Sequence, residues 1–152
     1  TQSNPIWDKW AYDARKRFSD PVLIPKSNSA MKQVIRVIRE PLPFYYLPDM
    51  DHGERNSVFV PFFGVQAATL PMVSKLAKLT KAKVIWGIAE TTDEGYIMHL
   101  SDPLENFPTD DPVADTERLN RELEQFILRH PDQYLWTHRR FKTRPQGEPP
   151  VY

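Results

Sequence analysis

Two aspartates and a histidine, Asp49, Asp51 and His52, stand together in the stretch YLPDMDH. The stretch 43–47 before them, which is rich in aromatic residues, has the character of a strand. In α/β sheets ligands bind beyond the carboxyl ends of strands, so polar side chains here are well placed for function. Acid–base chemistry needs a histidine with an orienting carboxylate, and His52 is the histidine with acids close in sequence. The alternative is a solvated turn, because Pro-Asp-x-Asp-x-Gly is rich in turn-forming residues.

An uncharged block, residues 56–74, follows this polar stretch directly. Its apolar side chains either form part of the core or line a slot for a hydrocarbon tail. The second use is energetically sound, because each buried methylene contributes about 0.8 kcal/mol. The residues that would form the wall of such a slot are Phe59, Phe62 and Phe63.

A basic stretch near the other end, residues 138–144, has the sequence HRRFKTR. Its cations Arg139, Arg140 and Lys142 are interleaved with aromatic side chains. Such mixtures bind phosphates, nucleic acid or anionic lipid, and arginine grips phosphate with two parallel hydrogen bonds. The alternative is a charged run that only faces solvent.

Composition excludes several kinds of site. The 152 residues contain no cysteine, so disulfides and thiolate metal sites are excluded, and the net charge of zero indicates no class of partner. No serine-nucleophile motif or glycine-rich phosphate loop is present, and we expect no cofactor. No run of about 20 apolar residues qualifies as a membrane span. The other histidines, His99 and His130, are expected to be structural.

Helices interleaved with strands must position these residues, so we predict an α/β fold with a mixed sheet covered by helices. Asn4 and Pro5 predict the cap and first turn of an amphipathic helix packed on the core. Ser27 or Ser29 begins the second helix, which Pro41 ends, and Asp115 or Thr116 begins the last. The expected helices cover about 5–18, 30–40, 70–80 and 116–130, and the expected strands cover 43–47, 58–63, 83–90 and 96–100, the last two as a hairpin.

Two longer stretches of the sequence are YYLPDMDHGERNSVFVPFFGVQAAT and DQYLWTHRRFKTRPQGEPPVY. Together they resemble the late acyltransferases of lipid A biosynthesis. The similarity covers essentially the whole chain, 1–152. It implies a glycerol-phosphate acyltransferase-like fold. It also implies transfer of a fatty acyl chain from acyl carrier protein to a hydroxyacyl chain of a Kdo-bearing lipid A precursor. The implied location is the cytoplasmic face of the inner membrane of Gram-negative bacteria, and nucleic acid is not an expected partner.

The catalytic motif of that family, a histidine followed five positions later by Asp or Glu, is absent. The residues five positions after the four histidines are Ser57, Leu104, Leu135 and Thr143. The resemblance therefore implies the C-terminal part of the enzyme, without the N-terminal membrane helix and the general base, and inactive alone. It assigns supporting roles to Arg17 and Asp51, which we expect to pair. It assigns substrate binding to Asp49, His52, Arg139, Arg140 and Lys142. The rival interpretation is a module that binds RNA or an anionic membrane through the basic stretch.

Overall fold

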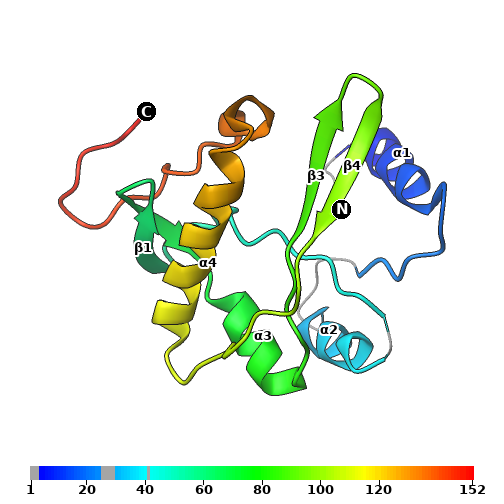
Figure 1. The fold of residues 1–152 in the computed structure, drawn as a ribbon, viewed down its shortest axis with the longest axis horizontal. Coiled ribbons are helices and arrows are strands. Elements are labelled where there is room, and N and C mark those ends of the chain that lie inside the picture. The colour runs from blue at the N-terminus through cyan, green and yellow to red at the C-terminus, as the bar shows by residue number, and fades with distance from the viewer. Residues whose placement is uncertain (1–3, 25–29, 41) are drawn as a thin grey trace. The chain divides into compact units, whose positions relative to one another are not determined.

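The structure is a computed structural model that describes residues 4–24, 30–40 and 42–152. The chain divides into two units, Thr1–Phe44 and Tyr45–Tyr152. The first contains helices α1 and α2. The second contains two helices and two hairpins (Figure 1).

Helix α1, Pro5–Lys16, begins where the sequence predicts. The Asn4 side chain accepts a hydrogen bond of 2.9 Å from the backbone N–H of Ile6, and Pro5 occupies the first turn. Its apolar face is not packed as expected, because Trp7 and Trp10 are 60% and 63% exposed. The two rings instead contact each other edge to face at 5.5 Å.

Helix α2, Ala30–Ile38, carries the predicted apolar stripe. Val34, Ile35 and Ile38 are half-buried, whereas Met31 is exposed. The predicted caps Ser27 and Ser29 and the predicted stop Pro41 lie outside the described residues.

Two antiparallel hairpins provide the strands of the second unit. Strands β1, Val58–Phe62, and β2, Val65–Thr69, are joined by two residues, Phe63 and Gly64, which both have positive φ. Positive φ at both central positions matches the twist of the strands, which explains this tight turn. Strands β3, Gly87–Thr92, and β4, Gly95–Leu100, pair in the same way across another two-residue turn.

The α/β class is confirmed, but the predicted single mixed sheet is wrong for the described residues. Parallel pairing needs a crossover of a dozen or more residues, whereas both hairpins have two-residue turns. The predicted strand 43–47 does not form. Pro43 and Pro48 at its ends cannot donate hydrogen bonds to a ladder. Strand β2 lies in the uncharged block and was not predicted.

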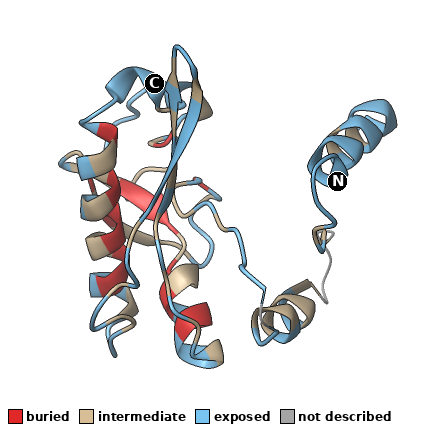
Figure 2. Cartoon of the chain, turned by 45° about the vertical axis from the view of Figure 1, so that its right-hand side comes forward, coloured by how far each residue is buried: buried red, intermediate tan, exposed pale blue. Residues whose placement is uncertain are grey.

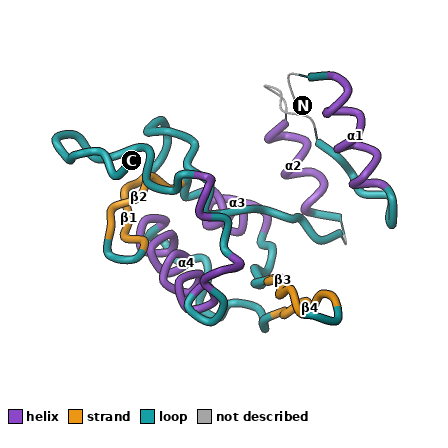
Figure 3. The backbone as a smooth tube through the Cα atoms, turned by 90° about the horizontal axis from the view of Figure 1, so that it is seen from above, coloured by secondary structure: helices purple, strands orange, loops and turns teal. Residues whose placement is uncertain are grey.

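Helix α4, Pro112–Ile127, lies between the two hairpins (Figures 1 and 3). Most of the buried residues lie on one side of α4, on helix α3, Met72–Thr80, and on hairpin β1–β2 (Figure 2). The central cluster consists of Phe62, Ala67, Leu123 and Ile127, against which Phe63, Trp86, Ile88, Tyr134 and Phe141 pack. Two 3₁₀ turns, Pro131–Gln133 and Trp136–His138, lead from α4 into the basic stretch.

The start of α4 differs from the prediction. Asp111 is the N-cap, and its carboxylate accepts hydrogen bonds from the N–H groups of Val113 and Ala114 at 2.9 and 3.1 Å. Asp115, a predicted cap, is instead buried and accepts a hydrogen bond of 2.5 Å from the hydroxyl of Ser74 on α3. The sequence offers three acids within six positions, Asp110, Asp111 and Asp115, and packing of α3 on α4 decides which one is buried.

Replacing the cap, Asp111→Ala, is expected to lower the free energy of unfolding by about 1 kcal/mol, because two N–H groups lose their acceptor. Urea unfolding followed by circular dichroism measures this loss. Glu105→Ala removes an equal charge from the neighbouring loop and should change stability by less than about 0.5 kcal/mol. Equal stability of the two variants would contradict the assignment of the cap.

Candidate functional site

Asp51 anchors the basic stretch to the loop after residue 48. The residue is only 6% exposed. Its Oδ1 accepts hydrogen bonds from the Gly53 N–H at 2.8 Å and from the Thr143 hydroxyl at 2.9 Å. Its Oδ2 accepts another from the Thr143 N–H at 2.9 Å. Asp51 therefore fixes the position of residues 139–144, hereafter the basic segment. Asp51 and Thr143 are 92 positions apart in the sequence.

Asp49 makes a second link between the same parts of the chain. The Tyr134 hydroxyl donates a hydrogen bond of 2.8 Å to Asp49 Oδ2. Burial raises the pKa of Tyr134 well above its ordinary value, and the nearby negative Asp49 adds to this effect. The phenol therefore keeps its proton and remains a donor.

Arg140 is turned inward from the basic segment and is 1% exposed. Its Nη1 donates to the Ala68 carbonyl at 2.8 Å, its Nη2 donates to the Thr69 hydroxyl at 2.5 Å, and its guanidinium lies 5.3 Å from the centre of the Phe62 ring. Burial lowers the pKa of Arg140, and the neighbouring acids oppose that shift. The sequence assigned Arg140 to an anionic substrate, but here its guanidinium bonds to strand β2 of the protein itself.

Arg139 and Lys142 are the exposed cations of the basic segment. Arg139 has a φ of 53°, a left-handed conformation that turns the chain after the second 3₁₀ turn. A pocket of about 160 Å³ lies beside them, lined by Arg139, Phe141, Lys142, Pro150, Val151 and Tyr152. Two cations and two aromatic rings thus share one concave surface, an arrangement suited to an anionic group.

Two further predicted site residues are His52 and Arg17. His52 is exposed. Arg17 belongs to the first unit, where its guanidinium lies 4.9 Å from the Phe18 ring. The pairing of Arg17 with Asp51 therefore stays a prediction.

The predicted acyl-chain wall contains one core residue. Phe62 is fully buried and belongs to the central cluster, while Phe59 and Phe63 are half-buried. The Phe63 N–H donates to Glu124 on α4 at 2.7 Å. These contacts indicate that the uncharged block packs mainly against the protein.

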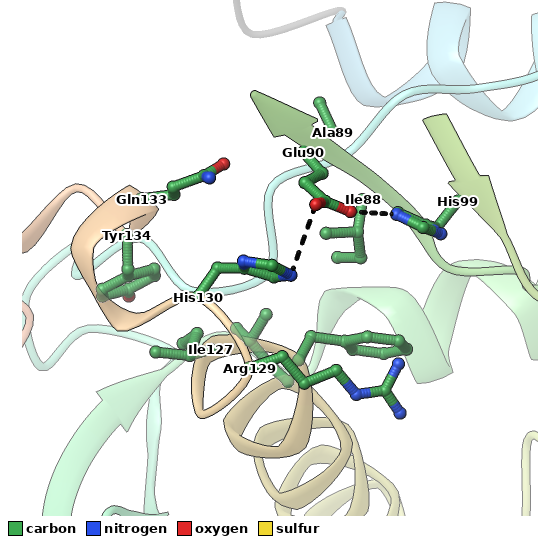
Figure 4. A pocket seen from close by; sticks show the side chains of 11 residues that line it. Ile88, Ala89, Glu90, His99, Ile127, Arg129, His130, Gln133 and Tyr134 are labelled. Carbon is green, nitrogen blue, oxygen red and sulfur yellow. Dashed lines mark hydrogen bonds and ion pairs between the residues drawn. The ribbon is translucent and has the colours of Figure 1, made fainter. Parts of the chain in front are cut away.

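A cluster that the sequence analysis missed joins Glu90, His99 and His130 (Figure 4). Glu90 Oε2 lies 2.6 Å from His99 Nε2, and Glu90 Oε1 lies 3.6 Å from His130 Nε2. The hydrogen bond with His99 lowers the pKa of Glu90. The hairpin register could have signalled the first contact, because Glu90 and His99 are diagonal neighbours on one face. His130 comes from the turn after α4, which no local pattern reveals.

The described ranges hold no group of three or more His, Asp or Glu side chains arranged to bind a metal ion. In the same ranges, no helix is both long and apolar enough to cross a membrane.

Residues 1–143 match the family model of the bacterial lipid A biosynthesis acyltransferases. The chain belongs to this family. It is 33% identical over 149 residues to the lipid A biosynthesis myristoyltransferase of Escherichia coli, which covers 97% of this chain and 46% of the relative. It is 35% identical over 152 residues to the lauroyltransferase of the same organism, covering 98% and 49%.

A third relative, a lipid A biosynthesis acyltransferase of Haemophilus influenzae, is 37% identical over 148 residues, covering 95% of the chain and 45% of the relative. The chain thus spans about half the length of the curated relatives it matches. The resemblance inferred from residues 45–69 and 132–152 is confirmed at the level of the family.

Proposed function

We propose that this chain is the C-terminal part of an acyltransferase in lipopolysaccharide biosynthesis. The enzyme moves a fatty acyl chain from acyl carrier protein to a hydroxyacyl chain of a Kdo-lipid A precursor, at the cytoplasmic face of the bacterial inner membrane. Family membership and the names of the relatives support this proposal. The general base and the membrane helix belong to a segment outside these 152 residues, so the chain alone transfers no acyl group.

In that reaction the base takes the proton of the acceptor hydroxyl, whose oxygen attacks the thioester carbonyl and releases the carrier thiol. The basic segment holds an anionic group of the lipid A precursor through Arg139 and Lys142. The placement of Arg139 and Lys142 supports this role. Arg140 is buried, whereas its exposed neighbours flank a pocket with aromatic walls. Asp51 acts as a positioning residue because it fixes Thr143 within the segment.

The double variant Arg139→Ala/Lys142→Ala tests this role directly. Each cation near an anionic surface contributes about 1 kcal/mol, so the pair should weaken binding about 30-fold. The measurement is binding of the purified chain to neutral vesicles that contain the Kdo-lipid A precursor. Lys75→Ala/Lys83→Ala removes two exposed cations elsewhere and serves as a charge-matched control.

Equal weakening in both double variants would show only a general charge effect and would contradict a specific site. Tighter binding of single-stranded RNA than of the precursor would favour the rival nucleic-acid module. Acyl transfer by the chain alone, with an acyl carrier protein donor, would contradict the proposed division of the enzyme.

A further inference from the structure

A second pocket, of about 170 Å³, lies between hairpin β3–β4 and the C-terminal end of α4 (Figure 4). Its floor is apolar and consists of Ile88, Leu123, Phe126 and Ile127. An apolar cavity of about 150 Å³ is large enough to hold a benzene-sized group. The floor can therefore accept several carbon atoms of a small aliphatic molecule.

The polar rim of this pocket contains one hydrogen bond and one longer ion pair, both made by Glu90. Glu90 Oε2 is bonded to His99 at 2.6 Å. Glu90 Oε1 and His130 Nε2 face each other at 3.6 Å, which is longer than a hydrogen bond. The described residues provide no hydrogen bond to this Oε1. Because this ion pair is too long for a direct hydrogen bond, a small polar group can bond to both the carboxylate oxygen and the imidazole nitrogen.

The walls that carry this rim are held together independently of Glu90. The Gln133 side chain donates to the Thr91 carbonyl at 2.9 Å and accepts from the Thr91 N–H at 2.8 Å. The Trp86 indole N–H donates to Glu122 on α4 at 2.6 Å. The pocket is therefore preformed, and a ligand need not bring the hairpin and helix together.

We propose that this pocket binds a short aliphatic alcohol. The hydroxyl donates to Glu90 Oε1 and accepts from the His130 Nε2–H, while the alkyl part lies on the apolar floor. A hydroxyl is both donor and acceptor, as these two partners require. An ionised alkyl carboxylate has no proton to donate to Glu90 Oε1 and would place a second negative charge beside it. An alkylammonium has no acceptor for His130 and faces Arg129 on the rim. This site is separate from the basic segment and does not depend on acyl transfer.

The test is a titration of the chain with straight alcohols from 1-propanol to 1-hexanol, followed by amide NMR shifts. The affected amides should lie in residues 88–90, 99 and 127–134. Affinity should rise about fourfold for each added methylene until the floor is filled. Hexanoate and hexylamine, which match 1-hexanol in length, should bind at least tenfold more weakly.

Glu90→Ala and His130→Ala should each weaken 1-hexanol binding about tenfold, the usual effect of losing a hydrogen bond with a charged or strongly polar partner. Glu54→Ala changes an exposed acid that does not line this pocket and should leave binding unchanged. Thermal unfolding of each variant separates lost binding from lost folding.

Shifts at other residues, or equal binding by the three head groups, would overturn the proposal. The same holds if affinity does not depend on chain length, because the gap would then be a site for water. Undiminished binding by a folded Glu90→Ala variant would also overturn it.

Discussion

Arg140→Ala is expected to lower the free energy of unfolding by about 3–5 kcal/mol. The substitution removes the donors to Ala68 and Thr69 and leaves the carboxylates of Asp49 and Asp51 without their nearby buried cation. It also removes the guanidinium packed on Phe62. Urea unfolding followed by tryptophan fluorescence measures the loss.

The neighbouring substitution Arg139→Ala is a matched control, because it removes the same charge from an exposed side chain. It should change the free energy of unfolding by less than about 0.5 kcal/mol. Arg140→Met keeps most of the buried volume and should cost less than Arg140→Ala, which separates loss of volume from loss of charge. Similar stabilities of the Arg139→Ala and Arg140→Ala variants would refute the inward orientation of Arg140.

Asp51→Ala is expected to destabilise the second unit by about 2–4 kcal/mol, because its carboxylate accepts three hydrogen bonds from Gly53 and Thr143. Amide hydrogen exchange should increase in residues 139–144, where the anchor is lost. Because the segment carries Arg139 and Lys142, binding of the anionic lipid should weaken as well.

Two variants sharpen this prediction. Glu54→Ala removes an exposed acid close in sequence and should leave both stability and exchange unchanged. Thr143→Val removes the hydroxyl hydrogen bond to Asp51, keeps the N–H bond, and should cost about 1 kcal/mol. If Asp51→Ala weakened lipid binding without faster exchange in the basic segment, Asp51 would contact the lipid instead of positioning the segment.

The sequence predicts a structural element correctly where residues close together in the chain determine it. Asn4 and Pro5 set the start of α1 because a cap involves only the next three residues. The β3–β4 hairpin followed from two apolar runs separated by turn-forming residues. Residues 43–47 have the aromatic character of a strand, but Pro43 and Pro48 cannot donate to a ladder, and no strand forms there.

The sequence by itself determined the family, the α/β class and the positions of most helices, because these depend on motifs and on periodicity along the chain. Only the tertiary structure decided that Arg140 points inward while Arg139 points out, since the partners of Arg140 lie 71 and 72 positions away. It also decided that His130 faces Glu90. Burial and charge pairing depend on which surfaces pack together. The local sequence of two adjacent cations therefore does not show which of them is buried.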